Sequence, residues 1–291
     1  MIRPLRPLGT LLLAAVLGAA PAHAGERVIS VDGAVTEIAY ALGQGHRLVA
    51  VDTSSAWPAE TAELPKVGYK RALTAEGLLS LRPTLVLATG AAGPAQALEP
   101  LRALGVPVVT LPDEPSVEGV LAKVRATAAA LDAAPAGDAL AARIAEELAA
   151  VRQRLAQAGP APRVLFLMDT GRGGLMAAGT GTAADAVIAL AGGANAFAGA
   201  EGLKPLTPEA AVATRPDVLV VTTQAVRRLG GLDRVTALPE LALTPAVRDG
   251  RVVAIDALLV LGFGPRIGEA VRTLAEAFHP GLPARTADVP R

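Results

Sequence analysis

The sequence contains no cysteine and very few aromatic residues. Among its 291 residues there are one Trp, two Tyr and four Phe. The absence of cysteine excludes disulfide bonds, thiolate metal sites and cysteine-based catalysis. It also excludes a lipid anchor on a cysteine at the start of an exported chain. The scarcity of aromatic side chains means that any ligand pocket must be lined mainly by aliphatic groups.

Neither sign of charge dominates, and histidine is scarce. The chain has 27 Lys and Arg residues, 27 Asp and Glu residues and three His residues. Nucleic-acid-binding domains concentrate positive charge. The sequence has no such basic patch, so a nucleic-acid partner is not indicated. The sequence has neither a Walker motif nor a Gly-x-Ser-x-Gly motif, which are common signatures of nucleotide-using and hydrolytic α/β enzymes. These absences favour a binding protein over an enzyme.

Residues 1–24 have the pattern of a cleavable export signal, or signal peptide. Arg3 and Arg6 are basic, residues 8–20 are mostly Leu, Ala, Val and Gly, and residues 22–24 (AHA) form a small-x-small cleavage site. The apolar run is shorter than the roughly 20 residues that span a bilayer, so cleavage is expected rather than a membrane anchor. A cysteine-free exported chain indicates the periplasm of a cell with two membranes.

After residue 24, short apolar runs alternate with helical patterns, which predicts an α/β fold. Strands are expected at residues 28–31, 48–51, 84–88, 108–111, 163–168, 217–222 and 251–255. Helices are expected at residues 35–42, 98–104, 116–131, 182–191 and 267–278.

One long helical pattern lies between the two halves. Its apolar stripe consists of Leu140, Ile144, Leu148, Val151 and Leu155. This spacing of three or four residues is typical of one buried helix face, and the Gly/Pro segment after it ends the helix. We predict an N-terminal α/β lobe at residues 25–136, a linking helix at 137–160 and a C-terminal α/β lobe at 161–291, both lobes Rossmann-like. Because a helix is stiffer than a loop, we expect little hinge closure.

A short internal repeat supports two related lobes. Residues 73–76 (LTAE) are followed by an Arg-Pro pair at 82–83, and residues 206–209 (LTPE) by an Arg-Pro pair at 215–216. In each copy the Thr is expected to cap a helix, with the Glu in its first turn, where a carboxylate suits the helix dipole.

The segments 68–73 (GYKRAL), 112–115 (PDEP), 176–179 (MAAG) and 261–266 (LGFGPR) resemble those of a known family. The sequence is similar, over essentially the whole chain after residue 24, to the periplasmic haem-binding proteins of bacterial ABC haem importers. These proteins belong to the helix-linked class, class III, which also carries cobalamin and siderophores. The resemblance implies two Rossmann-like lobes joined by one long backbone helix, and a monomeric substrate-binding protein that transports haem.

The resemblance assigns the iron ligand to Tyr69. Residues 69–71 (YKR) match the family's Tyr-x-Arg pair, in which the tyrosine binds ferric haem as a phenolate and the guanidinium stabilises its charge. Taken alone, a single tyrosine is more often an ordinary loop residue. Tyr40 lies at helical spacing and is expected in the core, and neither His46 nor His279 has a convincing context for an iron ligand.

The ligand is expected to be one ferric haem b, whose propionates need cations or N–H donors. Candidate cations are Arg71, Lys70, Arg172, Arg227 and Arg228. Some relatives supply a histidine from the second lobe, but residues 167–171 (LMDTG) contain none. A five-coordinate haem on Tyr69 is therefore expected.

The resemblance also implies a partner, an ABC permease dimer with its cytoplasmic ATPase. In this class one exposed glutamate on each lobe docks into arginine pockets of the permease. Glu76 and Glu209 match those positions, and two pseudo-symmetric carboxylates suit a two-fold symmetric partner. The alternative for each is a role in helix capping alone.

Two alternatives stay open at this stage. The same fold could bind cobalamin or a ferric siderophore in place of haem. A protein of another class, a nucleotide-using α/β enzyme, is disfavoured: residues 179–184 (GTGTAA) resemble a dinucleotide motif, but the expected strand before them ends about ten residues too early.

Overall fold

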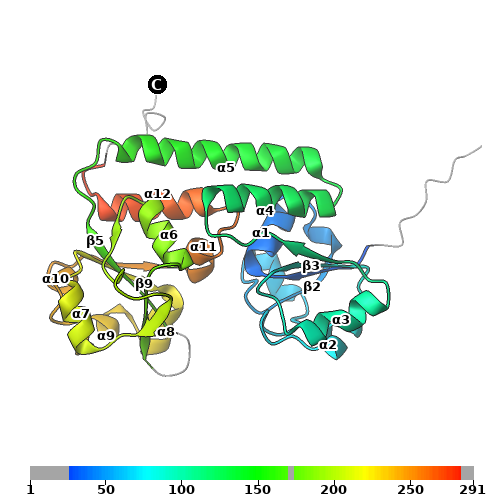
Figure 1. Cartoon of the computed structure of the whole chain (residues 1–291), viewed down its shortest axis with the longest axis horizontal. Coiled ribbons are helices and arrows are strands. Elements are labelled where there is room, and N and C mark those ends of the chain that lie inside the picture. The colour runs from blue at the N-terminus through cyan, green and yellow to red at the C-terminus, as the bar shows by residue number, and fades with distance from the viewer. Residues whose placement is uncertain (1–25, 170–173, 283–291) are drawn as a thin grey trace, which may run out of the picture.

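The computed structural model describes residues 26–169 and 174–282. The predicted signal peptide and Arg172 lie outside the described residues. Two α/β lobes lie side by side beneath one long helix, α5 (Figure 1). Within the described part of the chain, none of the helices combines the length and apolarity needed to cross a membrane.

The N-terminal lobe contains a four-stranded parallel sheet with the order β2-β1-β3-β4. Its strands are β1 (Val28–Val31), β2 (Leu48–Val51), β3 (Leu85–Thr89) and β4 (Val108–Leu111). Its helices are α1 (Gly33–Ala41), α2 (Ala75–Leu79), α3 (Ala95–Ala103) and α4 (Val117–Ala130), with short 3₁₀ turns at Gly45–Arg47 and Ala59–Glu63.

Alternate strand residues face the two helical layers. In β3, Leu85 and Leu87 pack in the core shared with α1 and α4, whereas Val86 and Ala88 pack in the core beneath α2 and α3. This alternation is the two-residue period of a strand. Because both faces are covered, the strands are apolar without a polar side.

The C-terminal lobe has a mixed sheet with the order β10-β9-β5-β6-β8, and β7 also pairs with β5. Its strands are β5 (Arg163–Asp169), β6 (Leu175–Ala178), β7 (Ala194–Asn195), β8 (Leu203–Pro205), β9 (Val218–Thr222) and β10 (Val252–Ile255). Its helices are α6 (Ala183–Leu190), α7 (Pro208–Thr214), α8 (Thr223–Leu229), α9 (Leu232–Thr236), α10 (Pro245–Arg248), α11 (Ala257–Leu261) and α12 (Ile267–Phe278). The α/β prediction is confirmed, and every expected strand and helix is present with small shifts at its ends.

Helix α5 runs from Ala134 to Leu155 and packs along α4 of one lobe and α12 of the other (Figure 1). It begins before the expected Gly137, with Pro135 in its first turn. Proline is tolerated there because the N–H groups of the first turn have no acceptor within the helix. The predicted stripe faces inward, since Leu140, Ile144 and Leu148 are buried. The lobe boundaries at residues 136 and 161 stay a prediction.

The two lobes share one apolar core. The core beneath α5 includes Leu87 of the first sheet, Ile144 of α5 and Val220 of the second sheet. Polar contacts reinforce this joint. The buried Glu37 of α1 accepts hydrogen bonds from both Nε (3.0 Å) and Nη2 of Arg266, the residue before α12.

A second polar contact crosses the joint nearby. Lys123 of α4 is fully buried, and its ammonium pairs with Asp113 at 2.9 Å and donates to the Gly262 carbonyl at 3.2 Å. The ammonium therefore bridges the two lobes.

The internal repeat has the same local structure in both lobes. Thr74 caps α2 and Thr207 caps α7 through their side chains, as predicted. The helix ends are also alike. The guanidinium of Arg27 donates to the Leu81 carbonyl after α2, and that of Arg163 donates to the Thr214 carbonyl in the last turn of α7.

The chain leaves both helices in the same way. Arg82 and Arg215, each followed by Pro, have φ values of 46° and 43°. The repeat is thus a structural duplication as well as a sequence match.

The Glu37–Arg266 pair should be a measurable contribution to stability. Arg266→Met leaves a buried, unpaired carboxylate, so we expect the free energy of unfolding to fall by about 3–5 kcal/mol. Urea denaturation measures this loss, and the double variant Glu37→Leu/Arg266→Met should recover most of it.

Burial raises the pKa of Glu37, so the folded variant binds a proton more tightly than the unfolded chain. The loss should therefore be smaller at about pH 5 than at about pH 8. Equal stability of Arg266→Met and the wild type would show that the pair contributes nothing.

Candidate functional site

The carboxyl ends of the parallel strands in the N-terminal sheet form a polar edge. Asp32 follows β1, Asp52 follows β2, Thr89 ends β3 and Asp113 lies just beyond β4. Ligands of open α/β sheets bind outside this edge. The corresponding edge of the other lobe lies opposite. Gly33, next to Asp32, is so close to Leu258 of α11, the helix after β10, that a methyl group added at Gly33 would lie 2.6 Å from the Leu258 side chain.

A buried network of hydrogen bonds fixes this edge. The hydroxyl of Thr36 bonds to those of Ser30 (2.9 Å) and Ser55 (2.7 Å), and Ser55 donates to Asp52 at 2.8 Å. All four side chains are buried. Because each polar group has a partner, the network favours one arrangement of the loops above it.

The turn at residues 68–72 lies over this edge and carries Tyr69. The Gly68 carbonyl accepts a hydrogen bond from the Thr53 N–H (2.9 Å), and the Ala72 N–H donates to the Tyr69 carbonyl (2.7 Å). The Lys70 carbonyl accepts from the Gly93 N–H at 2.8 Å. Gly68 has φ 95°, a value that glycine adopts without the strain that a side chain adds. The backbone of the turn is therefore held on both sides.

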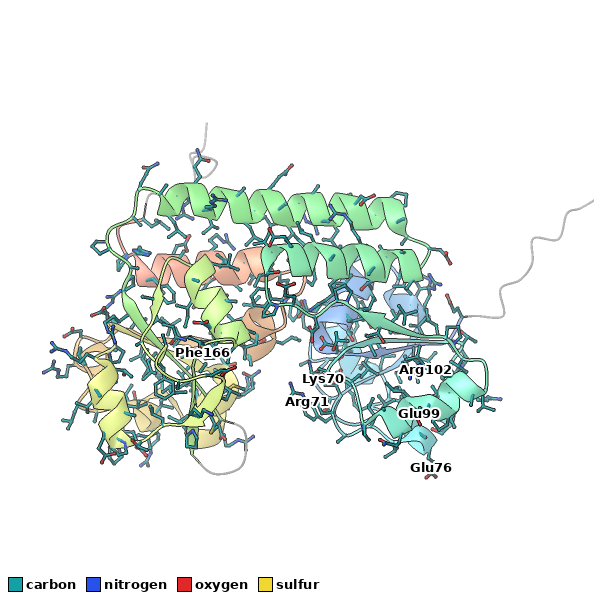
Figure 2. All side chains as sticks on the ribbon, in the orientation of Figure 1. Lys70, Arg71, Glu76, Glu99, Arg102 and Phe166 are labelled. Atoms are coloured by element: carbon teal, nitrogen blue, oxygen red, sulfur yellow. The ribbon has the colours of Figure 1, made fainter. Side chains whose placement is uncertain are left out.

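Tyr69 and Arg71 project outward from this turn. The Tyr69 side chain is 47% exposed, unusual for a large apolar group, and Arg71 is exposed and makes no ion pair with any residue of 26–169 or 174–282. Figure 2 shows Arg71 on the side of its lobe that faces the other lobe. Both side chains are available to a ligand between the lobes.

Lys70 points the opposite way from its neighbours. Its ammonium forms an ion pair with Asp32, which is 3% exposed. Burial alone would lower the pKa of Lys70, but the charge of Asp32 and its hydrogen bond outweigh burial and raise it. The Lys70 ammonium thus has a buried partner, and its expected contact with a propionate stays a prediction.

The second lobe offers two of the three expected arginines among the described residues. Arg228 in α8 donates from Nε to the Asp169 carboxylate at the end of β5, at 2.9 Å. Arg227 is exposed in the same helix. The third, Arg172, lies in the part of the chain that is left undescribed. Arg228 thus lies at the carboxyl edge of the second sheet, and Asp169 orients it.

A tryptophan lies at the joint between the lobes. Trp57 is 48% exposed, and the guanidinium of Arg266 lies 4.6 Å from the centre of its ring, a distance typical of a cation–π contact. Sequence reasoning missed this contact and the pairing of Lys70 with Asp32. The position of Asp32 directly after a buried strand was a signal for the second of these only.

The two glutamates of the repeat lie on exposed surface. Glu76 is in the first turn of α2 and Glu209 in the first turn of α7. Figure 2 shows Glu76 at the end of its lobe away from α5. Neither glutamate makes an ion pair with a described residue, so both carboxylates are accessible to a partner.

No cluster of three or more His, Asp or Glu side chains in the described ranges could hold a metal ion. If an iron-containing ligand binds here, Tyr69 is the best-placed donor in the turn. A phenol oxygen and guanidinium groups can bind a metal-containing ligand through its metal and its acidic groups.

Two α/β lobes joined along one helix, with a polar site at the facing strand ends, define a binding protein of the helix-linked class. The chain belongs to the periplasmic binding protein family, whose sequence profile matches residues 28–259. The predictions of this fold and of a binding protein rather than an enzyme are confirmed.

Three relatives show what the chain is similar to. The structure of the periplasmic heme-binding protein RhuT from Roseiflexus sp. RS-1, in apo form, aligns with 89% of this chain and 100% of its own, at 44% identity and TM-score 0.84. A periplasmic heme-binding protein from Pseudomonas aeruginosa aligns over 89% and 94%, at 34% identity and TM-score 0.80. The vitamin B12-binding protein of Yersinia pestis (strain Pestoides F) is 31% identical over 220 residues, 75% of this chain and 77% of its own.

The turn that carries Tyr69 should depend on Gly68. Gly68→Ala places a side chain at φ 95°, and we expect the free energy of unfolding to fall by about 1–2 kcal/mol. The added methyl group meets no atom closer than 3.5 Å, so the loss comes from backbone conformation. Gly159→Ala is the control, because that site has open space and no positive φ. Equal stability of the two variants, measured by urea denaturation, would contradict a strained turn.

Proposed function

We propose that this protein binds ferric haem b between its two lobes in the periplasm and delivers it to an ABC permease. The observation that carries this proposal is the exposed Tyr69 on an anchored turn, whose Arg71 lies on the side of the lobe that faces the other lobe (Figure 2). The similarity to heme-binding proteins at 44% and 34% identity supports the same ligand.

In the proposed complex Tyr69 binds the iron as a phenolate. A free phenol has a pKa of about 10, so ligation near neutral pH requires stabilisation of the anion. The iron supplies most of it, and the Arg71 guanidinium, two residues away and without an ion pair among the described residues, supplies more. An anionic oxygen ligand favours ferric over ferrous iron.

The propionates would meet cations of both lobes. Arg71 is the first candidate, and Arg228 and Arg227 of α8 are the next. Arg228 keeps its Nε on Asp169 and is 56% exposed, so the outer edge of its guanidinium is available for a second hydrogen-bonded partner. Arg172 stays a candidate by sequence alone.

Cobalamin is the second candidate ligand. The vitamin B12-binding relative aligns with 75% of this chain. The low aromatic content of the chain does not exclude a corrin as the ligand. A corrin needs no phenolate, however, and the orientation of Tyr69 would then have no role. A ferric siderophore is a weaker alternative because nothing at the site favours it specifically.

The family and the two exposed glutamates support a role in transport. The proposed partner is a permease dimer with its cytoplasmic ATPase, docked through Glu76 and Glu209, and the binding protein is proposed to act as a monomer. Export to the periplasm would use residues 1–24 as a cleavable signal peptide.

Haem binding can be tested by titration of the purified protein with hemin. We expect a saturable absorption spectrum of phenolate-ligated ferric haem, with one haem per chain, and quenching of Trp57, the only tryptophan. Tyr69→Phe removes one oxygen atom and should weaken binding by about 100-fold or more, beyond the 10–100-fold typical of groups next to a ligand. Tyr40→Phe is the matched control, because Tyr40 is the other tyrosine and packs against the core. Saturable binding of cyanocobalamin without specific hemin binding would replace haem by the corrin.

Docking can be tested by charge reversal. The double variant Glu76→Arg/Glu209→Arg should abolish haem uptake through the permease, because like charges would face the arginine pockets. Its hemin affinity should stay within about twofold of the wild type, since both sites are surface positions away from the turn. Glu99→Arg, on exposed surface of α3 (Figure 2), is the control. Normal uptake by the double variant would remove these glutamates from the docking surface.

A further inference from the structure

The turn that presents Tyr69 is attached to the sheet through Lys70. Tyr69 and Arg71 are exposed, whereas the Lys70 side chain between them is 20% exposed and reaches the carboxylate of Asp32. The side chains of Tyr69 and Arg71 are therefore exposed, whereas that of Lys70 between them is directed to the edge of the sheet. An ammonium held in the sheet fixes the direction of the residues on either side of it.

Asp32 is itself held in place by several bonds. One carboxylate oxygen accepts from the Ala34 N–H at 2.9 Å, which caps α1, and the other accepts from the Thr89 hydroxyl at 3.3 Å in addition to the Lys70 ammonium. Its backbone has φ 146° and ψ 132°, a region that residues other than glycine rarely adopt. Such strain persists only where the surroundings hold the residue firmly, and it concentrates at functional positions.

The ion pair is also favoured by its neighbours. The Asp52 and Asp113 carboxylates lie at the same sheet edge, and their charges also attract the Lys70 ammonium. The pair is shielded from solvent on the Asp32 side, where only 4% of the side chain is exposed. A shielded pair is screened by salt much less than a surface pair.

We propose that Lys70 is a positioning residue, and that its ion pair with Asp32 fixes the turn so that Tyr69 and Arg71 meet the ligand in one orientation. This inference rests on the proposed haem-binding function and goes beyond it. An oriented ligand group loses less freedom on binding, so rigidity of the turn should appear as affinity and as strength of the iron–oxygen bond.

Three variants separate position from charge. Lys70→Met removes the anchor but leaves Asp32 unpaired, which could unfold the lobe. Asp32→Asn/Lys70→Met removes both charges and keeps a side chain that can cap α1. Lys70→Arg keeps the charge and should restore the pair. Lys66→Met is the matched control, because Lys66 is in the same lobe, donates to the Ser55 and Thr61 carbonyls and forms no ion pair with a described residue.

The haem-bound readout is the acid transition in which a proton displaces iron from the phenolate. In Asp32→Asn/Lys70→Met we expect hemin affinity to fall by about 10–100-fold and the midpoint of this transition to rise by at least about one pH unit, since a tenfold weaker bond needs tenfold fewer protons. Lys70→Arg and Lys66→Met should stay close to the wild type. A wild-type midpoint in the double variant would overturn the proposal.

A second readout needs no haem. Amide hydrogen exchange of residues 68–73 and of Gly93 should be at least about tenfold faster in the double variant than in Lys66→Met, because the turn opens locally. Unchanged exchange would overturn the anchor even if hemin binds. If the wild type does not bind hemin, the proposed function fails, and faster exchange still supports the anchor for whatever ligand the cleft accepts.

Discussion

One apolar core that passes beneath α5 and enters both lobes is the constraint on which the rest of the structure depends. Residues as distant in sequence as Val35 and Val271 belong to it. Separating the lobes would expose that core to water and would also break the Glu37–Arg266 and Lys123–Gly262 contacts. Such a joint opposes hinge motion far more than a flexible loop would, because packed interiors deform little.

A stiff joint changes how a ligand can be bound. We expect no large closure around a ligand, so the groups that meet the ligand should already be oriented. The hydrogen-bond network of Ser30, Thr36, Ser55 and Asp52, and the tethered turn above it, provide that orientation. We therefore expect release to need an external force on the two lobes. Two exposed carboxylates at Glu76 and Glu209, one on each lobe, are suitably placed to receive it.

Much of this fold could be predicted from the sequence, because buried strands and helices have clear periods. Residues 28–31, 48–51 and 108–111 are strands with the expected bounds. The short elements of the second lobe could not be predicted: β8 is only Leu203–Pro205, exposed and ending in proline, without a periodic signal. At the site, Tyr69 and Arg71 came from a motif. The direction of Lys70 did not, because its partner is 38 residues away and only the folded sheet brings them together.

The duplicated helix ends fit the proposed docking of Glu76 and Glu209 to a two-fold symmetric partner. A surface glutamate can arise by a single substitution, and a matching pair would then mean little. Here each glutamate stands on a helix that begins with a threonine cap, ends at a carbonyl held by an arginine guanidinium, and leaves through an Arg-Pro pair whose arginine has positive φ. Capping alone would not require the same ending in both lobes. Duplication of the motif gives the same ending in both lobes, and it places the two carboxylates in equivalent frames, as the proposed symmetric partner needs.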